Sequence, residues 1–241
     1  MLSHPPQLNH LDDCPPPITD TTALTEIAKT WSIFPVSEAS PISLRALRPS
    51  SGSSELLPIN RTFTARDFPK VQDRQHAFEQ SALELNQVGY NTYIVMNPIR
   101  PDFCGNAVSD RDIACRQRLL IDLDRTSGLD APATDAEIDA AADVAHTIID
   151  YFRVERGFEL HRMMSGNGHH IYIPLNDIPN DSTAKTLCQQ FLMNLARRFN
   201  TTDVKVDTSV FNASRITKVP GTIARKGLEA PGRPYRMARV L

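Results

Sequence analysis

Hydrophobic positions along the chain recur at two spacings, which together predict alternating strands and helices. Apolar residues that alternate or run together predict strands at 41–48, 90–99, 116–125 and 203–210, and a pair of strands within 158–175. Apolar residues three and four positions apart predict helices at 21–31, 67–86, 134–152 and 181–199. We therefore expect an α+β protein organised around a sheet.

The two later helices carry the strongest helical patterns. Thr134 and Glu137 have the spacing of a capping box at the start of the helix at 134–152. The apolar stripe predicted for this helix consists of Ile138, Ala142, Ala145, Ile149 and Phe152. The side chains predicted to face inward from the helix at 181–199 are Leu187, Phe191 and Leu195.

The two ends of the chain differ from its middle. Residues 1–40 combine a Pro-rich stretch with a short helix and are predicted to form an arm, whereas 41–241 are predicted to form one domain. Within that domain "SGSS" (51–54) predicts a turn, and Pro69 is expected in the first turn of a helix. The last residues, "RMARVL", have a strand-like pattern, so we expect the native chain to continue beyond Leu241.

The strand at 116–125 sets two negative charges beside apolar residues. Successive side chains of a strand point to opposite faces. Asp122 and Asp124 therefore share one face, and Ile121 and Leu123 share the other.

Two further strands show the same parity. In 203–210, Asp207 lies on the face opposite Val206, and within 158–175, His170 lies opposite His169. If these strands form one sheet backed by helices, its open face gathers the three aspartates and His170.

Three carboxylates on one face would repel one another without a cation. Mg²⁺ or Mn²⁺, which prefer oxygen ligands, would relieve this repulsion. Two such ions about 4 Å apart are the usual apparatus of phosphoryl or nucleotidyl transfer. We do not expect zinc, because Cys104, Cys115 and the scattered histidines lack the spacing of common zinc sites.

Composition narrows the function classes. The 241 residues are 41% hydrophobic and 22% charged, which is ordinary for a soluble globular protein. No apolar run approaches the roughly 18 residues of a membrane span, and the N-terminus lacks the features of a signal peptide. The four cysteines form no CxxC motif, which favours a reducing, cytoplasmic location.

The net charge of −2 conceals a basic C-terminal segment. Residues 205–241 contain eight Lys or Arg residues and only two acidic ones, Asp207 and Glu229. This asymmetry favours an anionic partner such as nucleic acid or nucleotide phosphates.

Two glycine-containing stretches, "SGNG" (165–168) and "KVPGT" (218–222), predict a hairpin turn and a type II turn.

Three stretches together resemble a known family. "LLIDLDR", "SGNGHHIYIPL" and "VKVDTSVFNASRITKVPGTIARKG" occur in the order and spacing of the archaeo-eukaryotic primase superfamily. The sequence is most similar to the primase-polymerases of phages, plasmids and integrated elements, over about residues 42–241. The resemblance implies a catalytic sheet like the RNA-recognition fold, joined to an N-terminal α/β unit, with the active site in the cleft between them.

The resemblance also implies an activity and partners. It implies a DNA primase or primase-polymerase that uses a single-stranded DNA template, NTP or dNTP substrates and two Mg²⁺ or Mn²⁺ ions. It implies the N-terminal part of a longer replication protein of a mobile element that works with a helicase. This chain has no Walker A motif, so the helicase would lie elsewhere.

Residue by residue, the family motifs match ten positions. The metal-binding and catalytic carboxylates match Asp122, Asp124 and Asp207. The turn and histidine that contact the nucleotide match Ser165, Asn167 and His170, with His170 preferred over His169. The triphosphate-binding residues match Arg215 and Lys218, while Arg225 and Lys226 are candidates for phosphate or template contacts.

Three other interpretations remain open from the sequence. A rolling-circle initiator or nickase would pair the histidines of "HHIYI" with a nucleophilic tyrosine such as Tyr151. However, adjacent histidines in a strand point to opposite faces and cannot chelate one ion together. A polymerase-beta-like enzyme would need a Gly-Ser turn before the carboxylates, which is missing. A catalytically inactive nucleic-acid-binding module would have no reason to keep like charges together.

Overall fold

The computed structural model describes residues 19–49 and 57–241. The predicted turn at 51–54 and most of the predicted Pro-rich stretch lie outside the described residues. The helices are α1 (Asp20–Ala28), α2 (Thr30–Ile33), α3 (Val71–Gln87), α4 (Asp135–Arg156) and α5 (Ser182–Phe199), with one 3₁₀ turn at Asp110–Asp112. The strands are β1 (Ile42–Leu47), β2 (Ile59–Phe63), β3 (Asn91–Val95), β4 (Cys115–Arg125), β5 (His161–Met164), β6 (His169–Pro179), β7 (Val204–Val206), β8 (Ile216–Lys218), β9 (Ile223–Ala224), β10 (Arg236–Met237) and β11 (Arg239–Val240).

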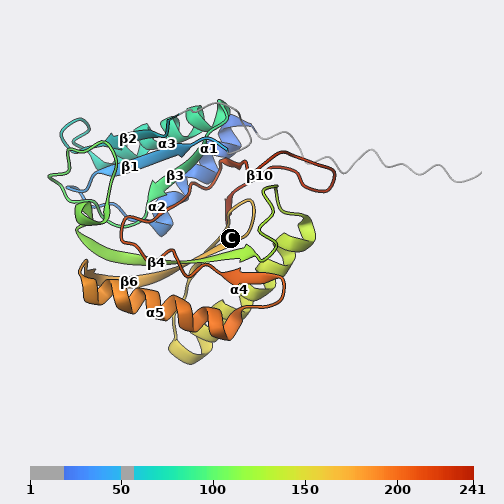
Figure 1. The fold of residues 1–241 in the computed structure, drawn as a ribbon. Coiled ribbons are helices and arrows are strands. Elements are labelled where there is room, and N and C mark those ends of the chain that lie inside the picture. Colours follow the sequence, from blue (N-terminus) through green and yellow to red (C-terminus); the bar gives the residue numbers. More distant parts are fainter. Residues whose placement is uncertain (1–18, 50–56) are drawn as a thin grey trace, which may run out of the picture.

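Two antiparallel sheets organise the molecule. A small sheet has the strand order β2-β1-β3-β8, and a large sheet has the order β11-β5-β6-β4-β7. In Figure 1 the small sheet lies below α1 and α3, and the large sheet lies above α4 and α5. Each sheet is thus covered by helices on its outer face, and the two inner faces look toward each other. The mixture of helices and sheets agrees with the prediction from the sequence, and the antiparallel pairing is a finding of the structure.

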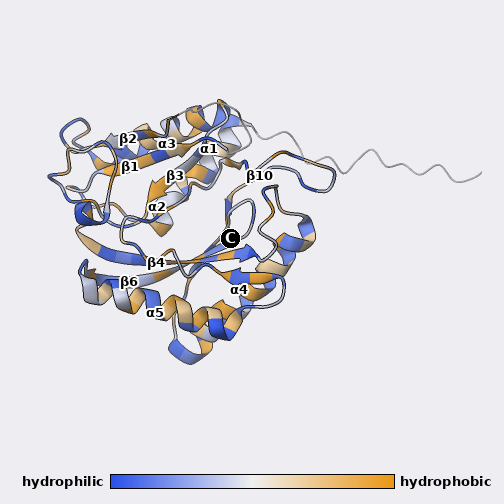
Figure 2. Ribbon diagram, viewed as in Figure 1, coloured by the Kyte–Doolittle hydropathy of each residue, from blue (hydrophilic) through white to orange (hydrophobic). Residues whose placement is uncertain are grey.

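Side-chain parity explains why each sheet has one apolar and one polar face. In β1, Leu44 and Ala46 are fully buried, and this strand packs against α3. In β4, Ile121 and Leu123 are also fully buried. Helices α4 and α5 alternate hydrophobic and hydrophilic residues along their length (Figure 2), as helices that cover a sheet do. The residues between the buried ones therefore point into the space between the sheets.

One hydrophobic cluster spans both halves of the molecule. It includes Ile27, Ile33 and Phe34 from the first forty residues together with Leu44 and Ile121 from the two sheets. The short helix predicted for 1–40 is present as α1, and it packs against α3. The boundary at residue 40 stays a prediction.

Several predicted details of the helices were wrong. The buried residues of α4 are Ala141, Val144, Ala145, Ile148 and Phe152, so Ala145 and Phe152 are buried as predicted, whereas Ile138, Ala142 and Ile149 are only partly buried. In α5 the buried residues are Ala184, Cys188, Leu192 and Leu195, and Leu187 is 59% exposed. Helix α3 begins at Val71, so Pro69 precedes it.

Three predicted strands are shorter or divided in the structure. The strand expected at 90–99 ends at Val95. The strand expected at 203–210 ends at Val206, where a turn begins. The strand-like C-terminus is divided between β10, which pairs with β9, and β11, which pairs with β5. None of the helices in the described residues is both long enough and apolar enough to cross a membrane.

Candidate active site

Strands β4, β6 and β7 bring the predicted polar residues of the large sheet together. Asp122 lies directly across the β4–β6 ladder from His170. On the other side of β4, the backbone N–H of Asp207 donates a hydrogen bond of 2.8 Å to the carbonyl of Asp122. Asp124 pairs with Lys205 of β7. Because residues opposite each other in a ladder share a face, the parity predicted from the sequence is confirmed.

A cavity of about 400 Å³ lies between the two sheets at these residues. All ten residues singled out from the sequence line it: Asp122, Asp124, Ser165, Asn167, His170, Asp207, Arg215, Lys218, Arg225 and Lys226. The remaining lining residues are Leu47, Asn91, Tyr93, Leu120, Ile216, Thr217 and Ala224. The cavity therefore collects three carboxylates on one wall and several cations around them.

The two aspartates of β4 differ in their electrostatics. Burial raises the pKa of Asp122, but the charges of His170, Arg215 and Lys226 outweigh it and hold that pKa below its usual range. Burial, the charge of Asp122 and the charge of Asp207 raise the pKa of Asp124. The carboxylates therefore repel one another, and a divalent cation would relieve this repulsion.

His170 is held by a chain of polar contacts between the sheets. Its Nε2 lies 3.3 Å from Oδ1 of Asp122, and its Nδ1 lies 3.0 Å from the hydroxyl of Thr217 in β8. That hydroxyl in turn lies 2.7 Å from the hydroxyl of Tyr172. Since Thr217 belongs to the small sheet and His170 to the large one, this chain fixes the histidine ring relative to both walls of the cavity.

The turn at 165–168 approaches neighbouring backbone closely, and glycine makes this possible. A Cβ at Gly168 would lie 2.2 Å from the carbonyl oxygen of Leu123, and one at Gly166 would lie 2.3 Å from Cβ of Ala224. Gly166 also has a φ of +99°. The predicted hairpin is confirmed, because β5 and β6 pair on either side of this turn. Asn167 accepts a hydrogen bond from the backbone N–H of Ala133.

The basic residues of the cavity occupy different environments. Lys218 is buried, and its Nζ donates to Oδ1 of Asn91 (3.2 Å) and to the carbonyl of Ile223 (3.0 Å). Burial and the charge of Arg225 hold its pKa well below the usual range. By contrast, the side chain of Arg215 makes no hydrogen bond or ion pair within the described residues, and its charge acts on Asp122.

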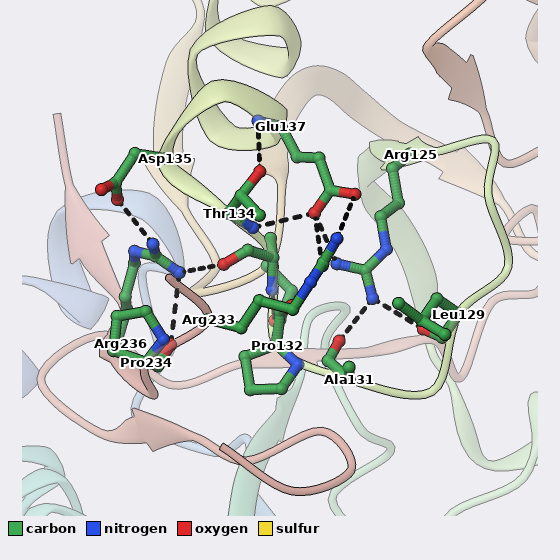
Figure 3. A network of polar contacts seen from close by, with 12 residues as sticks. Arg125, Leu129, Ala131, Pro132, Thr134, Asp135, Glu137, Arg233, Pro234 and Arg236 are labelled. Carbon is green, nitrogen blue, oxygen red and sulfur yellow. Dashed lines mark hydrogen bonds and ion pairs between the residues drawn. The ribbon is translucent and has the colours of Figure 1, made fainter. Parts of the chain in front are cut away.

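Two other residues of the basic C-terminal segment have structural partners. Arg233 donates to both carboxylate oxygens of Glu137, and Arg236 donates to Asp135 (Figure 3). The buried Arg125 donates to Glu137 as well. Arg233 and Arg236 thus anchor the C-terminal segment to the start of α4. The charge count of the sequence therefore overstated how many cations face an anionic partner.

No group of three or more His, Cys, Asp or Glu side chains within residues 19–49 and 57–241 lies close enough together to hold a metal ion as the structure stands. The donor chemistry of Asp122, Asp124 and Asp207 nevertheless fits Mg²⁺ or Mn²⁺, because all the ligands are carboxylate oxygens. The raised pKa of Asp124, which is due first to burial and then to the charges of Asp122 and Asp207, agrees with this fit.

Sequence reasoning missed three residues that shape the cavity. Asn91 accepts from Nζ of Lys218 and from the backbone N–H of Arg225, and it donates to the carbonyl of Arg225. Tyr93 lines the cavity, and burial together with the charge of Asp122 raises its pKa to about 12. Asn91 and Tyr93 alternate in β3 and could have been found by parity, whereas the contact of Thr217 with His170 joins two sheets and has no local signal.

The features that suggested a nickase lie apart from each other. His169 is buried on the opposite face from His170, and neither of its ring nitrogens has a hydrogen-bond partner in the described part of the chain. Tyr151 packs against Phe152 and Phe199 and is not among the residues that line the cavity. No pair of histidines and no α4 tyrosine is thus placed for that chemistry in the described structure.

Comparison with known proteins supports the fold. No protein family model matches the sequence, and no curated protein matches it. A similar solved structure is the polymerase domain of Ligase D from Mycobacterium tuberculosis in complex with DNA, with a TM-score of 0.51 and 16% sequence identity. The match covers 91% of this chain and 81% of that chain. This chain shares a polymerase-domain fold. A shared fold does not fix a function, so the chemistry has to be argued from the cavity.

Proposed function

We propose that this protein is a primase-polymerase of the archaeo-eukaryotic primase superfamily, which joins nucleotides on a single-stranded DNA template. The observation that carries the proposal is the gathering of Asp122, Asp124, Asp207 and His170, with several cations, in one cavity between the sheets. The shared fold with a polymerase domain supports nucleotidyl transfer, and the DNA in that complex supports DNA as the partner.

Asp122, Asp124 and Asp207 would hold two Mg²⁺ or Mn²⁺ ions. Such ions, when bound, lower the pKa of an attacking hydroxyl and stabilise the charge on a leaving oxygen. The low pKa of Asp122 keeps its carboxylate ionised and available as a ligand at neutral pH. The hydrogen bond from the backbone N–H of Asp207 to the carbonyl of Asp122 keeps the two residues next to each other on neighbouring chain segments.

The cations and the glycine turn would bind the triphosphate. Arg215 and Lys226 line the cavity and act electrostatically on Asp122, so a phosphate held by them would lie beside the aspartates. Lys218 lines the same cavity, where Asn91 fixes its Nζ, and would donate a hydrogen bond to the phosphate. His170, held by Thr217, would donate to a phosphate oxygen, and the turn at 165–168 would let backbone approach the same group.

The biological role that we propose rests on the resemblance of the sequence to primase-polymerases and not on the cavity. We propose that the protein makes primers and extends them during replication of a mobile element, together with a helicase and in the cytoplasm. NTPs or dNTPs would be the substrates.

A template-directed extension assay tests the proposed function. Purified protein is supplied with single-stranded DNA, with or without a primer, and with Mg²⁺ or Mn²⁺ and either dNTPs or NTPs. We expect metal-dependent product from the wild type and none above background from the Asp122→Ala/Asp124→Ala protein, because the ligands of both ions would be lost.

The matched control replaces two exposed carboxylates of α4, as Asp139→Ala/Asp143→Ala, and should extend DNA at the wild-type rate. Equal product from the wild type and from the Asp122/Asp124 variant would refute the proposed function. DNA binding by the wild type without any product would identify an inactive binding module instead.

A further inference from the structure

A second, smaller cavity of about 210 Å³ lies beside the active-site cavity. The two cavities share two lining residues, Arg215 and Ile216. The polar side chains that line the second cavity are Ser43, Arg45, Asn60, Asn212, Ser214 and Arg215. This wall carries two guanidinium groups, hydroxyls and amides, and no carboxylate or aromatic ring.

The small sheet connects the two cavities through one continuous face. Arg45 of β1 lies directly across from Asn60 in β2 and from Tyr93 in β3. Tyr93 in turn lies across from Lys218 in β8. Since cross-strand partners share a face, Arg45 stands in the same row as two residues of the active-site cavity. A nucleic-acid strand that leaves the active-site cavity across this sheet would next meet Arg45.

The two arginines of the second cavity lack partners. The Nε–H groups of Arg45 and Arg215 are buried and donate to no acceptor within the described residues, and neither side chain forms an ion pair there, although each side chain as a whole is only half-buried. Other buried arginines are satisfied through their terminal nitrogens, as Arg74 is by the carbonyls of Phe68 and Glu38. Leaving a buried N–H group without an acceptor costs free energy, so these two half-buried arginines fit an anion that the protein alone does not supply.

The loop that brings Arg215 to the cavity is fixed from behind. Asp110 accepts hydrogen bonds from both the backbone N–H (2.9 Å) and the hydroxyl (2.8 Å) of Ser214. These bonds lower the pKa of Asp110 despite its partial burial, and the charges of Lys185 and Arg116 act in the same direction. The carboxylate of Asp110 is therefore already hydrogen-bonded to Ser214, and Asp110 does not line the second cavity.

We propose that the second cavity binds a backbone phosphate of single-stranded DNA, next to the site of the reacting nucleotide. This inference rests on the proposed function and extends it to a strand-binding site. The cavity suits a phosphate group better than a whole nucleotide, because it is smaller than the roughly 300 Å³ of ordinary ligand sites and has no ring on which a base could stack. Arg45 and Arg215 would both donate to the phosphate oxygens.

The test measures binding without catalysis. Affinity for a fluorescently labelled single-stranded DNA oligonucleotide is measured by anisotropy over a range of salt concentrations, in EDTA and without nucleotide. We expect Arg45→Gln to weaken binding roughly five- to tenfold and to reduce the slope of log K against log salt by about 0.7, the value for one lost phosphate contact on a single strand. Arg45→Lys should restore most of the slope, because it keeps the charge.

The control variant is Arg61→Gln, in which the altered residue follows Asn60 in β2 but points to the other face, toward Ser81 and Glu84. It should bind DNA as the wild type does. A second measurement follows a fluorescent nucleoside triphosphate with Mg²⁺. Weaker triphosphate binding by Arg45→Gln with an unchanged DNA salt slope would overturn the inference, because the phosphate would then belong to the nucleotide.

The proposed phosphate site would also be overturned if Arg45→Gln bound DNA with unchanged affinity, or if Arg61→Gln lost as much DNA affinity as Arg45→Gln. The result is separable from the proposed function. A wild type that makes no product but shows the Arg45-dependent slope would refute nucleotidyl transfer and leave the phosphate site in place.

Discussion

The backbone N–H of Asp207 donates to the carbonyl oxygen of Asp122 across 2.8 Å. This single bond extends the pairing of β4 with β7 by one position beyond the end of β7 at Val206. The third carboxylate is therefore positioned by backbone pairing together with one contact of its own side chain. Its Oδ1 accepts from the N–H of Ser209, which turns the chain away after the strand.

Replacing Asp207 with asparagine should remove activity and spare the fold. Asp207→Asn keeps the backbone bond to Asp122 but removes one negative charge from the proposed metal site. We expect nucleotidyl transfer to fall by at least about a thousandfold and stability to change by less than about 1 kcal/mol. Extension assays and urea unfolding measure the two effects. Asp203→Asn, an exposed change four residues earlier, is the control and should leave activity intact.

Loss of the Thr217 hydroxyl should affect the reaction through His170. Thr217→Val preserves shape but leaves Nδ1 of His170 and the hydroxyl of Tyr172 without their shared partner. We expect a destabilisation of about 1–2 kcal/mol and a roughly tenfold lower kcat with unchanged metal affinity, because Thr217 positions the histidine and binds no ion. Thr186→Val on α5 is the control. Equal kcat in both variants would show that the polar chain does not position His170.

Glycine at 168 should be irreplaceable even by alanine. The added Cβ would lie 2.2 Å from the carbonyl of Leu123, so β4 or the turn would have to move. We expect Gly168→Ala to cost at least about 2 kcal/mol in the free energy of unfolding and to lower activity, because β4 carries Asp122 and Asp124. Gly128→Asn is the control, since Gly128 has a φ of +62° and open space around its Cα. A stable, active Gly168→Ala protein would contradict this account.

Parity within single strands was predictable from the sequence, because it depends only on the alternation of side chains. It placed Asp122, Asp124 and His170 on one face, and the ladder register confirms this. Long-range pairing was not predictable in the same way. Strand β8 lies late in the chain but joins β3 in the small sheet, which closes the cavity and brings Thr217 to His170.

Predicted helix faces failed where two apolar stripes competed. In α5 a stripe through Leu187 and Phe191 and a stripe through Cys188 and Leu192 have the same spacing, and the structure buries the second. Local pattern does not decide between them, because the choice depends on how closely small residues let the helix approach the sheet. Charge counts failed for a similar reason, since Arg233 contacts Glu137 ninety-six positions earlier in the chain.

The buried His169 should make stability fall in mild acid. Burial, Arg162, His170 and His146 lower its pKa to about 4. The unfolded chain takes up this proton near pH 6.5 and the folded protein only near pH 4, so protonation favours unfolding as pH falls through this window. We expect a loss of about 1–3 kcal/mol between pH 6.5 and 4.

Urea unfolding from pH 7.5 to 4 measures this loss, and His169→Leu should flatten the curve. His76→Gln, a change at an exposed histidine of α3, should leave the curve as steep as in the wild type. An equally steep curve in His169→Leu would assign the pH dependence to other groups.

Removing the carboxylate of Glu137 should destabilise the protein strongly, because three hydrogen-bond donors depend on it. It accepts from Arg125 and Arg233 and from the backbone N–H of Thr134 (Figure 3). Burial alone would raise its pKa, but these donors lower it to about 2. The associated stability is present above the unfolded value near 4.5 and is lost as pH falls toward 2.

We expect Glu137→Ala to destabilise the protein by about 3 kcal/mol at pH 7, because it leaves the buried Arg125 without its carboxylate partner. Most of this difference from the wild type should disappear by pH 2, where the wild-type carboxyl is itself half protonated. Asp143→Ala, at an exposed position of the same helix, should change stability by less than about 0.5 kcal/mol. A Glu137→Ala protein as stable as Asp143→Ala at pH 7 would show that the arginines find other acceptors, and that this network does not hold the C-terminal segment to α4.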